Sequence, residues 1–225
     1  MARLENLTFE EWLDHIFDHP VKEPQWYFDI DADYFDNPRQ CANYLQALFA
    51  DPKTHTATYT DAQVAQGLWM LISETEDHLD VLFSPYITQE QSKAVINNML
   101  NVFTDIFQAK CTPILSTTHS SGEDSIKLNP LNMICYMWWD IHRLYGKSGD
   151  PKREALDSTC LDVMQATLDI PHLPCQESAL HGLGHWYHAY PERVTSIIAT
   201  FIKDNPHAHP ALLAYAENAS VGYVL

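Results

Sequence analysis

The apolar residues of this chain recur at helical spacing along almost its whole length. Stripes at positions i, i+3, i+4 and i+7 repeat in successive segments, which is the pattern of amphipathic α-helices. No alternating pattern of useful strand length lies between them. The pattern predicts an all-α protein of about nine helices. The predicted helices lie near residues 8–20, 37–51, 60–72, 88–109, 129–146, 150–168, 177–190, 191–205 and 209–218.

Capping residues mark where these helices begin. Thr8, Thr60 and Thr88 each stand three residues before a Glu or Gln, a spacing that allows the hydroxyl to accept from a free backbone N–H of the first turn. Other helices are expected to begin with proline, whose missing N–H costs nothing in the first turn. Such X-Pro steps occur at Asn37, Asn129, Asp150, Tyr190 and His209.

The segment 130–146 is the most apolar of the predicted helices. It carries apolar side chains on nearly every side, including Trp138 and Trp139, which is typical of a helix at the centre of a fold. Gly146 is expected to end this helix as a C-cap residue. We therefore predict one uninterrupted central helix across this segment.

Residues 177–203 predict two helices joined at a corner before Pro191. Leu183 of the first helix and Ile197 of the second belong to apolar stripes, so we expect both side chains to be buried and to face each other across the corner. A helical wheel places a second set of residues opposite the apolar arc of the first helix, on a face expected to be exposed. This set consists of Glu177, His181, His185 and His188.

The same helix pair resembles a HEAT-type repeat. The resemblance implies an α-solenoid-like stack of antiparallel helix pairs and implies no activity. It is carried by Ala179, Leu180, Leu183, Gly184, Pro191, Val194, Ile197, Ile198 and Phe201.

One Ser/Thr-rich connection without periodicity, residues 111–129, divides the chain into near-equal parts. Residues 1–225 are expected to form a single helical-repeat domain. The alternative is two halves, 1–110 and 130–225, joined by 111–129 as an exposed loop.

Charge and cysteine content narrow the class of protein. The net charge is −17, with 13 Lys and Arg against 30 Asp and Glu. Binding to nucleic acid relies on cations that replace condensed counterions, so no nucleic-acid partner is expected. Five cysteines, an odd number, exclude a complete disulfide framework. No apolar run is long enough for a membrane span or a signal peptide, and the sequence predicts a cytoplasmic protein without a membrane partner.

The set Glu177, His181, His185 and His188 is the candidate metal site of the sequence. Histidines four residues apart on a helix can hold one zinc ion. Three His ligands from one helix would strain a tetrahedral site, so a distant residue is expected to contribute. The glutamate of a metalloprotease helix is missing, because residue 182 is Gly. An ordinary surface cluster is the alternative interpretation.

A second candidate site is the aromatic and acidic segment before the second predicted helix. Trp26, Tyr27, Phe28 and Tyr34 either cover the end of the helical stack or bind a partner. The chain has no GxSxG, GxGxxG or P-loop motif, and no cysteine has a base partner that the sequence reveals.

Three functional hypotheses follow from these features. The preferred one is a non-catalytic scaffold or adaptor that binds another protein. The alternatives are a metal-binding protein or metal-dependent enzyme that uses His181, His185 and His188, and an acidic inhibitor or immunity-type protein for a basic partner.

Overall fold

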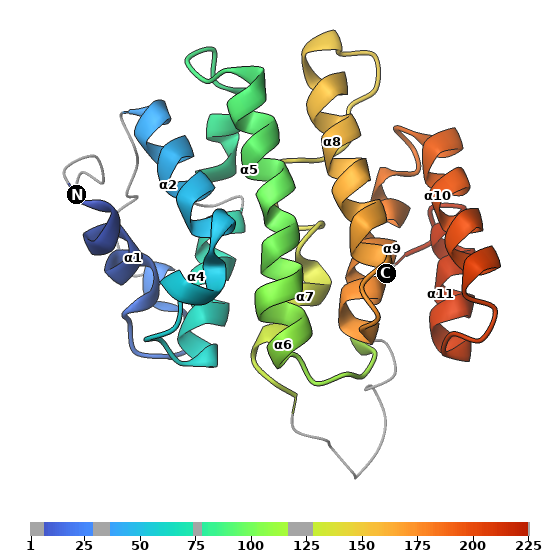
Figure 1. Cartoon of the computed structure of the whole chain (residues 1–225), viewed down its shortest axis with the longest axis horizontal. Coiled ribbons are helices and arrows are strands. Elements are labelled where there is room, and N and C mark those ends of the chain that lie inside the picture. Colours follow the sequence, from blue (N-terminus) through green and yellow to red (C-terminus); the bar gives the residue numbers. More distant parts are fainter. Residues whose placement is uncertain (1–6, 29–36, 74–77, 117–127, 225) are drawn as a thin grey trace.

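A computed structural model of the chain describes residues 7–28, 37–73, 78–116 and 128–224 (Figure 1). Across these ranges the regular structure is helical throughout and contains no strand, which confirms the predicted all-α class. Eleven α-helices occur within the described ranges, including two of three or four residues. They are α1 (Phe9–Phe17), α2 (Pro38–Ala50), α3 (Pro52–His55), α4 (Asp61–Ile72), α5 (Gln89–Val102), α6 (Gln108–Lys110), α7 (Leu131–Met137), α8 (Pro151–Leu168), α9 (Leu173–Trp186), α10 (Pro191–Asp204) and α11 (Pro210–Ala219).

Shorter helical pieces complete the fold. Two are 3₁₀ turns, η2 (Trp26–Phe28) and η3 (His78–Phe83). A π-helical segment, η4 (Phe103–Phe107), joins α5 to α6, so the predicted long helix runs through all three elements.

Thr8, Asn37, Thr60 and Thr88 are the N-cap residues of their helices, as predicted. The Thr8 and Thr60 side chains each accept from the backbone N–H three residues later, and both helices have complete capping boxes. The Asn37 side chain accepts from two first-turn N–H groups, with proline at the first helical position. These bonds satisfy donors that have no partner inside the helix, which fixes where each helix starts.

The helices pack in two rows that follow the order of the chain. In one row α2 contacts α5, and α5 contacts α8; in the other α4 contacts α7, α7 contacts α9, and α9 contacts α11. Figure 1 shows the colours passing from blue to red across the molecule in this order. The contact of α8 with α9 joins the two rows. Segments near in sequence therefore lie near in space, and α9 has neighbours on several sides.

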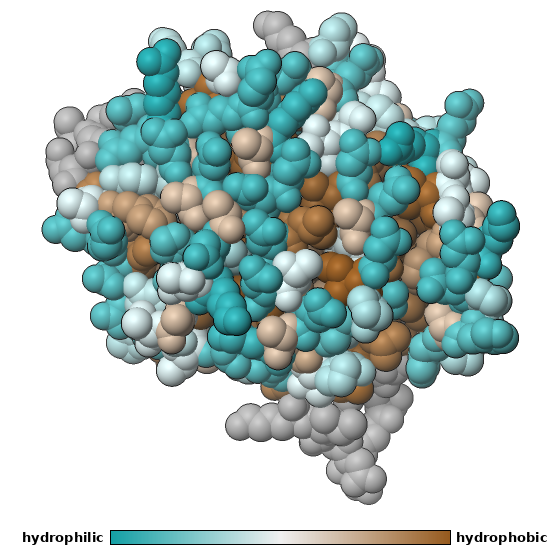
Figure 2. All heavy atoms as spheres, viewed as in Figure 1, coloured by the Kyte–Doolittle hydropathy of each residue, from teal (hydrophilic) through white to brown (hydrophobic). Residues whose placement is uncertain are grey.

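The apolar residues form a continuous core beneath a polar surface. Figure 2 shows a face on which polar side chains predominate, with apolar side chains visible between them toward its middle. All five cysteines are buried and unpaired by disulfides. No helix of the described ranges is both long and apolar enough to cross a membrane.

The prediction of one helix across 130–146 is wrong. Helix α7 ends at Met137, and a turn and an irregular segment follow. Trp138 and Trp139 are both buried, although neighbouring residues of a helix point about 100° apart. A Cβ atom added at Gly182 would lie 2.5 Å from the Cβ of Trp139, so this tryptophan packs directly on the backbone of α9. The turn after α7 brings Trp139 into that contact.

Part of the predicted connection 111–129 packs against the helices. Cys111 and Leu115 are buried, and the Asn132 side chain bonds to the backbone N–H and C=O of Thr112. The stretch 117–127 lies outside the described residues. The described beginning of this connection is therefore covered by α7 and its neighbours.

Candidate metal centre

Two histidines of α9 bring a ring nitrogen to the same point. His181 and His185 lie one helical turn apart, which places them on one side of the helix. Their Nε2 atoms are 3.1 Å apart. The His181 side chain is almost fully buried, and the His185 side chain is 38% exposed. The Nε2 atom of His181 is therefore held in the interior, and the Nε2 atom of His185 lies beside it at the surface.

Asp140 completes this cluster from the turn that follows α7. Its Oδ1 is 3.3 Å from His185 Nε2, and its Oδ2 is 3.9 Å from His181 Nε2. Trp139, the preceding residue, is the side chain that rests on Gly182 of α9. The packing of this tryptophan therefore positions the carboxylate next to the two histidines, although 41 residues separate Asp140 from His181 (181 − 140).

The three ligand-type atoms of Asp140, His181 and His185 lie within 4.8 Å of one another. We call these three residues the Asp-His-His cluster. Within residues 7–28, 37–73, 78–116 and 128–224, this is the one group of at least three His, Cys, Asp or Glu residues with such spacing.

The other ring nitrogen of His181 is held by a tyrosine. His181 Nδ1 is 2.7 Å from Tyr215 Oη of α11, and the Tyr215 hydroxyl is 3.3 Å from that of Tyr136 of α7. The Tyr136 ring also packs on the imidazole of His181, with ring centroids 4.3 Å apart. The tautomer with its proton on Nδ1 donates to Tyr215 and leaves the Nε2 lone pair facing Asp140 and His185. Such an outer hydrogen bond orients metal-ligating histidines.

Burial sets the charge of this site. Burial and, next, the neighbouring His185 lower the pKa of His181 to about 4, against the opposing effect of Asp140. His181 is therefore neutral at pH 7, the form in which imidazole binds a metal. Burial likewise raises the pKa of Tyr215 above its ordinary value, with Tyr136 as the next cause. Tyr215 thus remains a neutral hydroxyl that can accept one hydrogen bond and donate another.

The expectation that Glu177, His181, His185 and His188 share one exposed face is wrong for the first two. Glu177 and His181 are both buried, because α9 is covered by α7, α8 and α11. Glu177 Oε2 accepts a hydrogen bond from the backbone N–H of Ser116, at 2.7 Å. His188 is exposed and lies beyond the end of α9. The structure thus brings together two of the four residues and adds Asp140.

Two residues of the predicted aromatic site, Tyr27 and Phe28, line a pocket that also reaches Asp140. Trp26 is buried and stacks on His19, with ring centroids 3.5 Å apart, so it contributes to the core. Tyr27 is also buried, whereas Phe28 is 58% exposed. Tyr34 lies outside the described residues.

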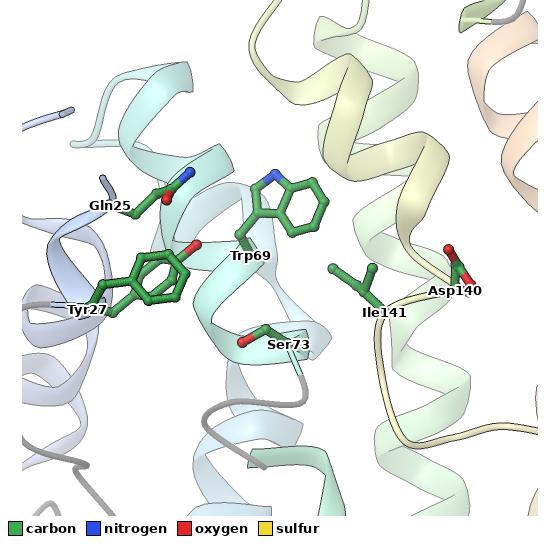
Figure 3. A pocket seen from close by; sticks show the side chains of 7 residues that line it. Gln25, Tyr27, Trp69, Ser73, Asp140 and Ile141 are labelled. Carbon is green, nitrogen blue, oxygen red and sulfur yellow. The ribbon is translucent and has the colours of Figure 1, made fainter. Parts of the chain in front are cut away.

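A pocket of about 540 Å³ extends from Tyr27 and Phe28 of the predicted aromatic site to Asp140 of the Asp-His-His cluster. Figure 3 shows Trp69 between Tyr27 and Ile141 in this view, with Asp140 next to Ile141 at one end. Asp140 therefore belongs both to this pocket and to the Asp-His-His cluster. The residues that line the pocket are Gln25, Tyr27, Phe28, Trp69, Ser73, Asp140 and Ile141.

No protein-family model, curated protein or solved structure matches this chain. The chemistry of the site is therefore inferred from its geometry.

The sequence analysis missed Asp140 as a candidate ligand and missed the contact of Cys175 with His172. Asp140 is a single carboxylate within the most apolar segment of the chain, and this isolation was a usable signal. The Sγ of Cys175 lies 3.4 Å from Nδ1 of His172, so this cysteine does have a neighbouring base. Hydrogen bonds from Cys135 and then His172 lower the pKa of Cys175, against the effect of burial. Because Cys175 is fully buried, a substrate has no access to its thiol.

Proposed function

We propose that this protein binds one divalent transition-metal ion through the Asp-His-His cluster and keeps coordination positions open for an exogenous ligand. The observation that supports this proposal is the convergence of two imidazole nitrogens and a carboxylate within 4.8 Å. Three protein ligands with an open position are typical of catalytic metal sites, whereas structural zinc sites are closed by four. The protein is thus proposed to be a metal-dependent binding protein or enzyme.

The distances fit a first-row metal ion. Two metal–nitrogen bonds of about 2.0–2.1 Å to atoms 3.1 Å apart subtend an angle of about 100°. This value lies between the tetrahedral and octahedral angles. A carboxylate oxygen of Asp140 lies 3.3 Å from His185 Nε2, which is within reach of the same ion. Imidazole suits zinc, iron, nickel and copper, and carboxylate is compatible with each. Zinc is the ion expected first, because this donor set imposes no redox requirement.

The metal content of the protein tests this proposal. Protein produced without a histidine tag and dialysed against zinc is expected to retain about one ion per chain, measured by mass spectrometry of the metal. His185→Ala is expected to lose the ion, and its exposure makes the fold tolerant of the change. His188→Ala is the matched control, since it removes an exposed histidine three residues further on. Zinc well below one per chain in the unchanged protein contradicts the proposal.

Two further variants distinguish a proposed ligand of the Asp-His-His cluster from an acidic residue outside it. Asp140→Asn keeps the shape of the side chain and removes its charge, so zinc affinity is expected to fall. Glu177→Gln is expected to leave one zinc ion per chain, because Glu177 bonds to Ser116 and lies outside the cluster. Loss of zinc from Glu177→Gln, with Asp140→Asn unaffected, would place the ligands as the sequence first indicated.

A second candidate function is a cytoplasmic helical-repeat scaffold that binds another protein. The two rows of helices support a HEAT-like, α-solenoid arrangement, and the net charge of −17 favours a basic partner, including one inhibited by this chain. Exposed aromatic side chains such as Phe28 and Tyr86 are the contacts that such interfaces use. Buried free thiols favour a reducing compartment.

Affinity purification at low and high salt tests this second function. A specific basic partner should be retained at low salt and released as salt screens the charges. Its loss from Phe28→Ala, and retention by Tyr86→Ala, would place the contact near the aromatic pocket. The absence of any partner at low salt argues against a scaffold.

A further inference from the structure

The pocket beside Asp140 has the composition of a small-molecule site. Four of its seven lining residues are aromatic or aliphatic: Tyr27, Phe28, Trp69 and Ile141. A volume of about 540 Å³ falls in the range of ligand sites, which combine apolar walls with a few polar groups. The polar groups are Gln25, Ser73 and Asp140. An apolar ligand with one polar end fits this distribution.

The shape of the pocket favours a flat apolar group. Trp69 comes from α4 and Ile141 from the segment after α7, and both side chains line the pocket (Figure 3). The Tyr27 and Phe28 rings add aromatic surface, with centroids 4.9 Å apart. Aromatic rings offer large, flat contact area to a planar ligand. The polar end of such a ligand is then directed to the Asp140 end, where the proposed ion lies.

The net charge of the metal-loaded site indicates which polar group of a ligand would bind there. A divalent ion with the Asp140 carboxylate and two neutral imidazoles carries a net charge of about +1, since +2 − 1 = +1. One monoanionic oxygen ligand neutralises it. Without the ion, Asp140 repels an anion, in a chain whose net charge is already −17. An anionic ligand therefore needs the metal.

We propose that the pocket binds a small monocarboxylate with a flat apolar group, its carboxylate on the metal ion and its apolar part against the apolar lining residues, which include Trp69 and Ile141. This inference rests on the proposed metal centre. It adds the chemical class of the ligand, and it predicts that the metal and the carboxylate strengthen each other's binding.

Cobalt-loaded protein and two carboxylates, 2-naphthoate and acetate, test this proposal. The visible absorption of cobalt(II) changes when its ligands change, so titration gives an affinity for each compound. We expect 2-naphthoate to bind at least about tenfold more tightly than acetate, because acetate has no flat apolar group for the pocket. The metal-free protein, followed by tryptophan fluorescence, should bind 2-naphthoate at least about tenfold more weakly.

Two exposed aromatics provide a matched pair of variants. Phe28→Ala should weaken 2-naphthoate about threefold or more and leave acetate unchanged, because only the naphthyl group contacts this side chain. Tyr86→Ala removes an aromatic of similar exposure, 65%, outside the pocket, and should change neither affinity.

Each failure has a distinct meaning. Cobalt binding with equal affinities for 2-naphthoate and acetate overturns the role of the pocket and leaves the metal centre standing. Equal 2-naphthoate affinity with and without cobalt overturns the coordination of the carboxylate. If cobalt does not bind, the metal centre and this inference both fall.

Discussion

Removal of the Tyr215 hydroxyl is expected to weaken metal binding although Tyr215 is not itself a proposed ligand. The hydroxyl lies 2.7 Å from His181 Nδ1, and His181 is buried, so no water replaces it easily. In Tyr215→Phe the proton of the imidazole is no longer held on Nδ1. The tautomer with its proton on Nε2 then competes, and in that form the nitrogen that faces Asp140 and His185 cannot bind a metal.

The magnitude follows from what outer hydrogen bonds contribute elsewhere. Loss of such a partner typically lowers metal affinity by about 10–100-fold, which corresponds to about 1.4–2.7 kcal/mol. The metal-free variant should also lose about 1–3 kcal/mol of folding free energy, because a buried ring nitrogen is left without its partner. Tyr136→Phe removes a hydroxyl one step further out, 3.3 Å from that of Tyr215. Its effect on metal affinity should be about threefold or less.

The assay is competition for zinc against a chromophoric chelator, with protein stability measured separately by urea unfolding. Tyr223→Phe is the control, because Tyr223 is 63% exposed. The expected order of zinc affinity is unchanged protein and Tyr223→Phe together, Tyr136→Phe slightly weaker, and Tyr215→Phe weakest. A Tyr215→Phe protein that binds zinc within twofold of the unchanged protein refutes the role assigned to this hydrogen bond.

Three further predictions concern stability. Leu183→Ala should cost about 2–5 kcal/mol in chemical denaturation, whereas metal-free His185→Ala should stay within about 0.5 kcal/mol; the reverse order contradicts the described burial. Gly182→Ala should destabilise by about 1–3 kcal/mol and weaken zinc binding, because its methyl group displaces Trp139 and with it the neighbouring carboxylate; a gain in stability from helix propensity alone would disprove this contact. Burial, and next His15, lower the pKa of His78 from 6.5 to about 4, so stability present above pH 6.5 should be lost as pH falls toward 4, by about 3 kcal/mol. His78→Gln should flatten that part of the curve of unfolding free energy against pH, and an unchanged slope would remove His78 as its cause.

The sequence was sufficient for the all-helical class and for several of the helix starting points. Cap residues act through bonds to N–H groups two or three residues away, and the apolar stripes depend only on helical periodicity. Thr8, Asn37 and Thr60 therefore begin helices where the local pattern predicts. Leu183 and Ile197 are buried for the same reason, because the stripe of a helix must be covered by some neighbour.

Tertiary contacts decided where α7 ends and which residues form the Asp-His-His cluster. The apolar periodicity continues past Met137. Trp139, however, packs on Gly182, which belongs to another helix and lies 43 residues further along the chain (182 − 139). That contact turns the chain and carries Asp140 to His185. A wheel of α9 alone likewise cannot show that α7, α8 and α11 cover it and bury His181. Local hydrogen bonds and periodicity are properties of a segment, whereas burial and the meeting of ligands depend on which segments pack together.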